Sequence, residues 1–571
     1  MQKIVLLLLF TVAISFSAKS QGIQLDEDFR DWDSVDTLYS DSDDVPSGIN
    51  FSTLKIANDT QFIYFYLEVG DEINLQDFND ITLYIDTDNN VETGIKEFGI
   101  GYDFNFTFGA RSGNVYLNGT DPISAYDIGL VSSPTVTSTI FEFKFNLETN
   151  VDGQPLFSSE IISLKITGGE DQLPEPGETL TYQLSQDDFR PESFILKKPQ
   201  QGLRVLSYNV LTDNLFESGL QDNFRRIFRA IDPDIIGLQE VYNNSGADAS
   251  QLMESFLPSS DDEQWYSGDT GNDNLIVSRY PVIDQASIKG NAAYLLEFGE
   301  ETMLVIVAHP PCCTNNNGRQ DEFDAMMAFI RDSKSGQEFD LDQNSPILIL
   351  GDMNLVGFAR QQKTLLTGDI VNEQQYGSDF IPDWDGTSLD DAIPSNPNLP
   401  TTYTWYSENS SFSPGRLDYI VYTGSQLELT NSFSLYTPAL PGDTLEAYNL
   451  QAEDVTLVSD HLPVVADFTK IIPVYSEVQT DFPGTFQLNQ NHPNPFNPTT
   501  LISFELSKPE NVSLTIHNIS GQKVASIINN KQYLAGRFSV TFNAEGLSSG
   551  VYFYQLSNGS SVITKKMMLI K

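Results

Sequence analysis

The sequence predicts a multidomain protein in which two all-β segments flank a central α/β domain. Three patterns support this fold class. Residues 24–190 alternate short β-rich runs with turn clusters, residues 203–470 alternate buried apolar runs with helically spaced segments, and residues 488–571 return to short strands with turns. At 571 residues the chain is several times longer than a typical domain, so two to four domains are expected.

The first 20 residues have the pattern of a secretory signal peptide. Lys3 precedes an apolar run from Ile4 to Ile14, and the small residues of Ala18-Lys19-Ser20 suit a cleavage site. A membrane anchor is the alternative, but this run is shorter than the roughly 20 residues that span a bilayer. No later stretch approaches that length. We therefore expect a protein without a transmembrane segment that lies outside the cytoplasm.

Residues 21–195 are expected to form an all-β sandwich. The runs 62–67 and 81–85 are rich in β-branched and aromatic residues and are bounded by turn residues. The segment from DFRDW (28–32) through YIDTD (84–88) resembles the sugar-binding sandwich modules that are attached to many secreted bacterial enzymes. The resemblance implies a glycan partner for this module, without naming the glycan.

A cluster of oxygen donors follows the run 81–85. Asp86, Asp88 and Asn90 stand at the end of this strand, where they could bind a calcium ion. The alternative is an ordinary Asx-rich turn. The turn is favoured, because no glutamate stands where an EF-hand loop would need a bidentate ligand.

Residues 203–470 are expected to form the α/β domain, joined to the preceding module by a polar, proline-containing stretch near 189–202. Four apolar runs are nearly continuous, as expected for strands that are covered on both faces. Residues 223–230 and 321–330 show helical spacing with charged outer faces. The four runs are 205–208, 235–238, 303–308 and 347–350.

The formal net charge of −48 comes from 31 Lys and Arg residues against 79 Asp and Glu residues. Residues 203–470 alone carry 13 basic and 41 acidic side chains. Such a surface repels polyanions, which excludes tight nonspecific binding of nucleic acid unless cations bridge the charges. Adaptation to salty surroundings is the favoured explanation. Residues 488–571 differ, with 7 basic and 3 acidic side chains, and this change marks a domain boundary.

Only two cysteines are present, and they are neighbours, Cys312 and Cys313. A framework of disulfides is therefore excluded. Two alternatives remain open. Either both thiols are free, or the adjacent residues form a disulfide ring in an oxidising compartment.

Polar side chains follow the four apolar runs of the central domain. Asn209 and Glu240 come after the first two runs, and His309 follows the third. Asp352 and Asn354 close the fourth run two residues apart, so both point the same way and can reach one phosphate and its water. Phosphodiester hydrolysis needs a positioned water, a cation and a proton donor for the leaving oxygen. These residue types supply all three, although each alone would more often be a turn residue, a cap or a solvated acid.

A second histidine lies near the end of the domain. His461 follows Asp460, and we expect Asp418 to pair with its imidazole. A histidine oriented by an acid is a standard acid–base arrangement, because the acid fixes the tautomer and favours the imidazolium. Two of the four histidines of the chain, His309 and His461, occupy such places, although either one alone would more often be structural.

Together these motifs resemble the endonuclease/exonuclease/phosphatase superfamily, the group of DNase I, abasic-site endonucleases, sphingomyelinases and inositol phosphatases. The similarity covers about residues 203–470, and all six expected elements occur in the family order. They are YN (208–209), QE (239–240), His309, GDMN (351–354), RLDY (416–419) and SDH (459–461).

The resemblance implies a four-layer sandwich, in which two β-sheets are flanked by helices and the site lies at one edge. It also implies a divalent cation, Mg²⁺ or alternatively Mn²⁺. Glu240 would be the principal metal ligand, Asn209 would contact the metal or the phosphate, and Asp460 would be a further metal ligand.

The same resemblance implies the catalytic roles. Asp352 would align or deprotonate the attacking water, with Asn354 hydrogen-bonding beside it. His461, oriented by Asp418, would serve as a base or as a donor in the transition state. His309 would hold the phosphate or protonate the leaving group.

The loop after His309 departs from the better-known members of the superfamily. It reads PPCCTNNNGR (310–319), and two prolines with a vicinal disulfide would stiffen this rim of the site. Arg319 could bind a substrate phosphate. A salt bridge with nearby acids at the start of a helix is the alternative.

Residues 471–487 are expected to form a linker. The last segment contains NHPNPFNP (491–498), SGVY (549–552) and the terminal run KKMMLIK (565–571). Over its full length, residues 488–571 closely resemble the C-terminal sorting domain of the type IX secretion route, which is expected as a small β-sandwich. The resemblance implies the type IX secretion machinery as a partner, passage across an outer membrane, and release or surface attachment.

The sequence therefore predicts a secreted, metal-dependent phosphoric ester hydrolase. The first hypothesis is a nuclease or phosphodiesterase for extracellular nucleic acid, although no basic stripe supports it. The second is a phosphodiesterase or phosphatase for phospholipids, inositol phosphates or other small phosphoesters, although no apolar hairpin for docking on a bilayer is evident. The third, a binding protein on an inactive scaffold, is disfavoured because the acids, the amides and both histidines are retained.

Overall fold

The computed structural model is mostly β-strand, with few helices. It describes residues 22–41, 48–191, 194–260, 263–471, 486–506, 508, 510–533, 536–544, 546–559 and 561–570. The predicted signal peptide (1–20) and nearly all of the predicted linker (471–487) lie outside these residues. The chain divides into two compact units between residues 472 and 473. Among the described helices, none has the length and apolar character needed to cross a membrane.

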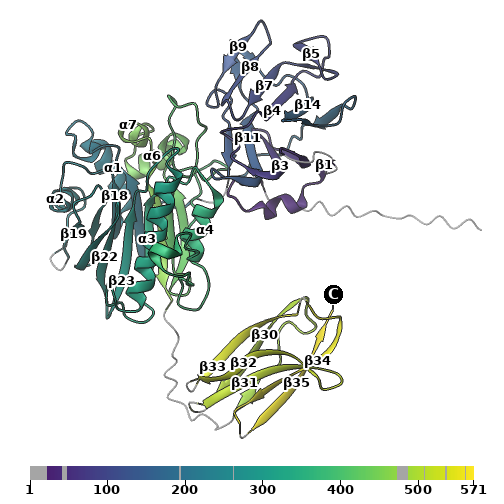
Figure 1. Cartoon of the computed structure of the whole chain (residues 1–571). Helices are drawn as coiled ribbons and strands as arrows, with labels where there is room; N and C mark the ends of the chain where they lie inside the picture. The colour runs from purple at the N-terminus through teal and green to yellow at the C-terminus, as the bar shows by residue number, and fades with distance from the viewer. Residues whose placement is uncertain are drawn as a thin grey trace, which may run out of the picture. The chain divides into compact units, whose positions relative to one another are not determined.

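The N-terminal part of the first unit is built mainly of two antiparallel sheets that face each other (Figure 1), with the short strand pairs β5-β6 and β12-β13 beside them. Its elements are η1 (Phe29–Ser34), β1 (Thr37–Ser40), β2 (Phe51–Asn58), β3 (Phe62–Ile73), β4 (Thr82–Asp86), β5 (Ile95–Glu97), β6 (Ile100–Tyr102), β7 (Phe104–Thr107), β8 (Ser112–Val115), β9 (Asp121–Ile123), β10 (Val131–Ser133), β11 (Ser138–Asn146), β12 (Asn150–Val151), β13 (Gln154–Pro155), β14 (Ile161–Gly168), β15 (Asp171–Leu173) and β16 (Leu180–Gln183).

One of these sheets has the strand order β1-β2-β3-β11-β10, and the other has the order β15-β14-β4-β7-β8-β9, with β16 beside β14. Aromatic side chains that alternate along the strands fill the space between the sheets. Phe65 stacks on Phe143 within one sheet, with ring centroids 4.9 Å apart. Phe145 meets Phe104 of the opposite sheet edge-on at 5.7 Å. We refer to residues 22–191 as the N-terminal module.

The second part of this unit contains two six-stranded sheets with helices outside them. Its elements are β17 (Leu203–Asn209), η2 (Asn214–Phe216), α1 (Gln221–Ile231), β18 (Ile235–Gln239), α2 (Gly246–Phe256), β19 (Tyr266–Asp269), β20 (Leu275–Ser278), β21 (Val282–Ile288), β22 (Asn291–Phe298), β23 (Glu301–Ala308), α3 (Asn316–Lys334), β24 (Ile347–Asp352), α4 (Ala359–Thr367), α5 (Glu373–Tyr376), β25 (Asp390–Asp391), β26 (Asp418–Tyr422), β27 (Leu427–Ser434), η3 (Thr437–Ala439), α6 (Gly442–Tyr448), α7 (Asp454–Val458) and β28 (Val464–Lys470).

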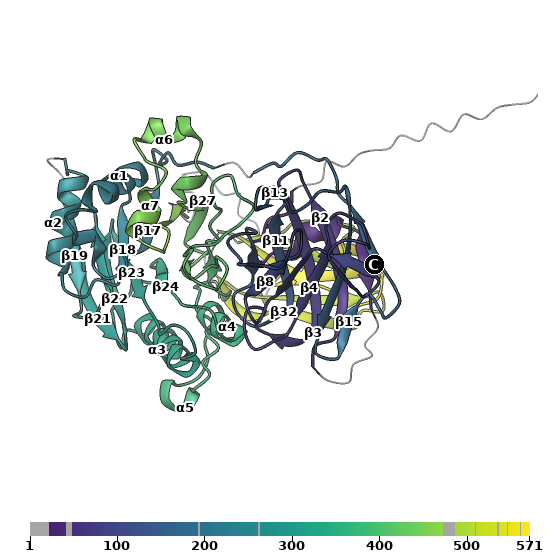
Figure 2. The ribbon, with the colours of Figure 1, turned by 90° about the horizontal axis from the view of Figure 1, so that it is seen from above.

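The two sheets are covered on both faces. Their strand orders are β19-β20-β18-β17-β28-β27 and β21-β22-β23-β24-β26-β25. Figure 2 shows α1, α2 and α7 outside the first sheet and α3 and α4 outside the second. Neighbouring strand residues therefore enter different cores. In β17, Val205 packs between the sheets while Leu206 packs beneath the outer helices, which explains the nearly continuous apolar runs.

Strand pairing brings the polar strand ends together. β17 and β18 are parallel, with Asn209 opposite Gln239, and β23 and β24 are parallel, with Ala308 opposite Gly351. β26 runs antiparallel to β24, so that its first residue, Asp418, lies opposite Asp352. The candidate functional residues of each sheet therefore lie together where its inner strands begin or end.

The C-terminal unit is a small pair of antiparallel sheets. Its strands are β29 (Gln487–Leu488), β30 (Thr499–Leu506), β31 (Glu510–Asn518), β32 (Lys523–Tyr533), β33 (Gly536–Asn543), β34 (Gly550–Ser557) and β35 (Val562–Leu569), in the orders β29-β30-β33 and β32-β31-β34-β35. Phe496 from the NHPNPFNP motif is buried in the core of this unit. Its backbone exchanges hydrogen bonds of 3.0 Å with Met568 and Ile570, which joins the motif to the last strand.

Candidate active site

Glu240 and Asn209 lie side by side because they end a parallel pair of strands. Asn209 Nδ2 donates to Glu240 Oε1 at 3.1 Å. Glu240 Oε2 accepts from the backbone N–H and from the hydroxyl of Thr212, at 2.9 and 3.1 Å. Both carboxylate oxygens of Glu240 are therefore fixed by neighbouring groups.

The segment that follows Asn209 has a strained backbone. Leu211, Thr212 and Asp213 have positive φ values of 47°, 51° and 64°, a region that L-residues occupy at a cost of about 1–2 kcal/mol each. Hydrogen bonds offset this cost. Asn209 Oδ1 accepts from the backbone N–H of Leu211 at 3.0 Å, and the buried carboxylate of Asp213 accepts from the backbone N–H and the amide of Asn243. These hydrogen bonds hold the strained segment in place, with Thr212 against Glu240.

Asp352 is the centre of the arrangement. Its Oδ2 atom lies 3.3 Å from Asn209 Nδ2. The same atom lies 3.5 Å from Nε2 of His461 and 3.6 Å from Nε2 of His309. An amide and two imidazoles thus converge on one oxygen of a carboxylate that is only 2% exposed.

His461 forms a buried pair with Asp418. His461 Nδ1 lies 2.8 Å from Asp418 Oδ2, and the backbone N–H of Asp418 donates to the hydroxyl of Thr404 at 2.8 Å. Burial disfavours the imidazolium, but the charges of Asp418 and Asp352 outweigh burial and raise the pKa of His461 to about 10. The structure thus places the Asp418 carboxylate beside the His461 imidazole, the two residues that the sequence analysis paired.

His309 has a partner that the sequence analysis did not single out. His309 Nδ1 lies 2.6 Å from Asp273 Oδ2, and its backbone N–H donates to Asn291 Oδ1 at 2.8 Å. Burial opposes the charge on this imidazole as well, but the hydrogen bond with Asp273 and the charge of Asp352 raise its pKa to about 9. Asp273 stands in the run NDN (272–274) before β20, and it reaches the site because β20 runs antiparallel to β18; a search for polar residues that precede apolar runs could have found it.

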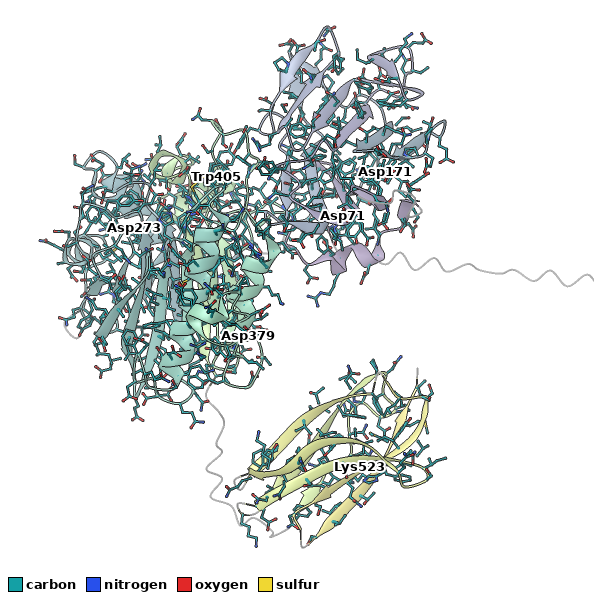
Figure 3. All side chains as sticks on the ribbon, in the orientation of Figure 1. Asp71, Asp171, Asp273, Asp379, Trp405 and Lys523 are labelled. Carbon is teal, nitrogen blue, oxygen red and sulfur yellow. A yellow bond between two sulfur atoms is a disulfide. The ribbon has the colours of Figure 1, made fainter. Side chains whose placement is uncertain are left out.

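Asp460 is tied to the site through two contacts. Its Oδ2 atom accepts from Trp405 Nε1 at 3.1 Å, and the neighbouring Ser459 hydroxyl donates to the Asn209 carbonyl at 2.8 Å. Figure 3 labels Trp405 and Asp273, both of which lie in the upper half of the α/β sandwich in that view.

The donors of this site fit a hard divalent cation. Asp352 and Asp418 offer carboxylate oxygens that lie within 4.8 Å of each other. Among the described residues, Asp418 Oδ1 and Asp460 Oδ1 are buried without a hydrogen-bond donor. Buried carboxylate oxygens need such compensation, and a cation would provide it. Carboxylate and amide oxygens suit Mg²⁺ or Mn²⁺.

Asn354 connects this centre to the loop after His309. Its backbone N–H donates to Asp352 Oδ1, and its Nδ2 donates to the Pro310 carbonyl, both at 3.0 Å. The side chain of Asn354 therefore hydrogen-bonds to the loop, while its backbone contacts Asp352.

Arg319 lies in the first turn of α3, directly after this loop. Its guanidinium is fully buried and donates to the carbonyls of Pro311 and Cys313, at 2.7 and 3.1 Å. Cys312 and Cys313 form a disulfide, so the ring alternative is the one that the structure contains. Within the described residues Arg319 forms no salt bridge, because its guanidinium donates to these two carbonyls and to the side-chain oxygens of Asn316 and Gln361.

The candidate calcium residues of the N-terminal module are only partly brought together. Asp86 and Asp88 join Asp103, which the sequence analysis missed, in a group whose ligand atoms lie within 4.8 Å of one another. Asn90 donates its backbone N–H to Asp86 at 3.0 Å, while its side-chain oxygen accepts from the backbone N–H of Glu92 at 3.1 Å. The side-chain oxygen of Asn90 therefore stabilises the turn and is not directed at the other two candidate ligands.

Two family models match the chain. The Endonuclease/Exonuclease/phosphatase family matches residues 206–461, and the Secretion system C-terminal sorting domain matches residues 491–571. The first of these matches covers less than half of the chain. Both resemblances inferred from the sequence motifs are thereby confirmed. The sorting domain indicates export by type IX secretion to the cell surface or the extracellular space.

No curated protein matches the chain. Several solved structures match it at low sequence identity. D. rerio TDP2 complexed with single strand DNA product is 15% identical, with 47% of this chain and 100% of that chain covered and a TM-score of 0.31. The human Nocturnin catalytic domain with bound sulfate is 19% identical, with 49% and 100% covered and a TM-score of 0.30. An endonuclease/exonuclease/phosphatase from Beutenbergia cavernae DSM 12333 is 15% identical, with 64% and 100% covered and a TM-score of 0.29.

Proposed function

We propose that residues 203–470 hydrolyse phosphoesters with Mg²⁺, or with Mn²⁺ in its place. The observation that carries this proposal is the convergence of Asn209, His309 and His461 on Asp352 Oδ2. Glu240 lies one hydrogen bond away from the same amide. Attack of water on a phosphate needs such a combination of a proton acceptor, proton donors and oxygen ligands around one point.

Glu240, Asn209 and Asp460 are the residues that would hold the cation. When bound, the cation would neutralise the charge that develops on the phosphate oxygens. The contacts of Glu240 with Asn209 and Thr212 orient its carboxylate for this role, as partners of metal ligands do.

The remaining side chains handle water and protons. Asp352 Oδ2 accepts the proton of the attacking water, and Asn354 donates its backbone N–H to the other oxygen and so fixes the carboxylate. His461, charged through Asp418, donates a hydrogen bond to a phosphate oxygen. His309, charged through Asp273, donates the proton that the leaving oxygen needs.

Two substrate classes fit this chemistry. Extracellular nucleic acid comes first, because a phosphodiesterase site and export by a sorting domain suit a scavenging nuclease. Small phosphoesters, inositol phosphates or phospholipids are the second class. The acidic charge favours this second class, because a net charge of −48 opposes the approach of a polyanion.

A substrate panel tests the proposal and separates the classes. Nicked plasmid, sphingomyelin, inositol phosphates and bis-nitrophenyl phosphate are incubated with the full chain and Mg²⁺, with and without a chelator. We expect at least one substrate to be hydrolysed, and the chelator to abolish the reaction. Activity that survives both the chelator and Glu240→Ala would contradict metal-dependent hydrolysis, and a complete lack of turnover would favour the inactive-scaffold hypothesis.

We further propose that residues 1–20 are a signal peptide, that residues 21–195 form a module with a glycan partner, and that residues 471–487 are a linker before the sorting domain at 488–571. Asp86 and Asp88, with Asp103 in place of the side chain of Asn90, would be the calcium ligands of the module. Calorimetric titration of the full chain with Ca²⁺, compared with Asp103→Asn, tests this; equal heats would contradict it.

A further inference from the structure

Two loops of the candidate active site are held by residues of the N-terminal module. The first, residues 355–357, directly follows Asp352 and Asn354. The second, residues 413–417, directly precedes Asp418. The backbone groups of a loop need hydrogen-bond partners, and for these loops many partners come from residues 22–191.

In the first loop, three consecutive carbonyls accept hydrogen bonds from the N-terminal module. These bonds fix the orientation of three successive peptide planes. The planes directly follow Asn354, whose backbone N–H donates to Asp352. The pairs are Leu355 with the Thr135 hydroxyl at 2.6 Å, Val356 with the Asn74 amide at 3.2 Å and Gly357 with the Thr137 backbone N–H at 2.8 Å.

The second loop is held by a buried ion pair. Arg416, whose side chain is 3% exposed, donates to Glu27 of the N-terminal module at 3.2 Å and to Asp391 at 2.8 Å. Glu27 is itself held by Glu142, which accepts its backbone N–H at 2.9 Å. Because Arg416 lies two residues before Asp418, this ion pair anchors the strand that carries the partner of His461.

Apolar packing continues across the same boundary. Val136 of the N-terminal module belongs to the hydrophobic core that contains Met353 and Leu355. Leu25 belongs to the core that contains Tyr208, the residue before Asn209. The module and the α/β sandwich therefore share two cores.

We propose that the N-terminal module is a positioning element of the active site, in which Glu27 and Thr135 fix the loops that carry Asp352, Asn354 and Asp418. This inference rests on the proposed phosphoester hydrolysis and adds a role for the module that a detachable glycan-binding domain would not have. Glu27 and Thr135 are positioning residues, because they act through Arg416 and Leu355.

Gly415 offers a test that is specific to this contact. A Cβ atom on Gly415 would lie 2.8 Å from Cγ2 of Thr135, which is too close for two carbon atoms. Gly415→Ala should therefore displace the second loop. Thr135→Ser removes the methyl group and keeps the hydroxyl that Leu355 accepts, so it should relieve the clash.

The experiment measures kcat and KM for bis-nitrophenyl phosphate with the full chain. We expect Gly415→Ala to lower kcat by about tenfold or more with a small change in KM, since small displacements of catalytic groups have large effects on rate. The double variant Thr135→Ser/Gly415→Ala should recover to within about twofold of Thr135→Ser alone. Thr181→Val, which alters an exposed hydroxyl on β16 of the same module, is the matched control and should leave kcat unchanged.

Hydrogen–deuterium exchange gives a second measurement that needs no turnover. Amides of 353–359 and 413–418 should exchange faster in Gly415→Ala and in Glu27→Gln than in the unaltered chain. If the unaltered chain hydrolyses no phosphoester, the proposed function fails while exchange still tests the positioning role. Unchanged kcat and unchanged exchange in Gly415→Ala, or failure of Thr135→Ser to restore a reduced kcat, would overturn the inference.

Discussion

Each charged candidate in the active site is oriented by a neighbour that lies behind it. Thr212 contacts Glu240, Asp418 contacts His461, and Asp273 contacts His309. Such neighbours fix the tautomer or the rotamer of the functional group, so less order has to be imposed when a substrate binds. Loss of such a neighbour should therefore weaken the function of the group that it orients.

Thr212→Val should weaken the binding of the metal without unfolding the protein. The variant keeps the shape of the side chain but loses the hydroxyl that Glu240 Oε2 accepts at 3.1 Å. Loss of a partner behind a metal ligand costs about 10–100-fold in metal affinity or activity. Titration of activity with Mg²⁺ measures the change, and Thr212→Ser should behave like the unaltered chain. Equal Mg²⁺ dependence for the valine and serine variants would contradict this role.

Lys144 should make stability depend on pH in the N-terminal module. Burial lowers the pKa of this amine to about 7, although it donates to the Gly129 carbonyl at 3.0 Å and to Asn146 at 2.9 Å. Its pKa in the unfolded chain is higher, so the unfolded state binds more protons between pH 7 and about 10. The free energy of unfolding should consequently rise with pH in this window.

Lys144→Met should remove that contribution. Urea denaturation at pH 7.0, 8.0 and 9.0 compares the variant with the unaltered chain, and the midpoint of the variant should depend less on pH and be higher at pH 7.0. Parallel midpoints for the two proteins would show that the amine stays charged in the folded state.

At the scale of elements, the segment 309–315 is a rigid connection between β23 and α3. The disulfide of Cys312 and Cys313 and the buried Arg319 constrain it from two sides. Arg319→Met should destabilise the first unit by about 3 kcal/mol, because it leaves buried carbonyls without donors. The urea midpoint measures this, with the exposed Arg30→Met as the control; equal midpoints would contradict the assigned role of Arg319.

The disulfide itself is tested by counting thiols in the unfolded protein. We expect no titratable thiol before reduction and two after reduction, since the chain has two cysteines and both are in the bond. Two thiols before reduction would show that the ring is absent.

The sequence predicted the polar residues that follow the strands, but it did not predict the residues that hydrogen-bond to them. Apolar runs followed by Asn209, Glu240, His309 and Asp352 were visible because burial on both faces leaves a continuous pattern. The hydroxyl of Thr404 behind Asp418 leaves no such pattern, because it acts from an irregular segment 14 residues away.

The role of Arg319 was also out of reach of the sequence. Its partners are two carbonyls of the preceding loop and the side-chain oxygens of Asn316 and Gln361, none of which marks itself in the sequence as a partner of an arginine. The packing of the N-terminal module against 355–357 was hidden for the same reason, since its acceptors are backbone carbonyls and its donors lie more than 200 residues away in the sequence.

At the scale of the whole molecule, the place to which the chain is exported and its negative charge determine the conditions under which a substrate binds. A chain that is sorted to the cell surface or beyond works at the ionic strength and divalent-cation concentration of its surroundings. Its net charge of −48 repels a polyanionic substrate, and salt screens that repulsion over a Debye length of about 8–10 Å.

If nucleic acid is the substrate, KM for DNA should fall several-fold as NaCl rises from low to moderate concentration, because screening reduces the repulsion. KM for bis-nitrophenyl phosphate, which carries a single charge, should change little. Initial rates at several salt concentrations measure both constants. A KM for DNA that rises steeply with salt would show that a basic surface, rather than bridging cations, holds the substrate.

The most direct test of the account is the initial rate of bis-nitrophenyl phosphate hydrolysis by the full chain and by Asp352→Asn, each with saturating Mg²⁺. Asp443→Asn, which alters an exposed acid of α6, serves as the matched control. We predict that Asp352→Asn loses at least about 100-fold in kcat, because the carboxylate on which both histidines converge is gone, while Asp443→Asn keeps full activity. Full activity of Asp352→Asn would contradict the account.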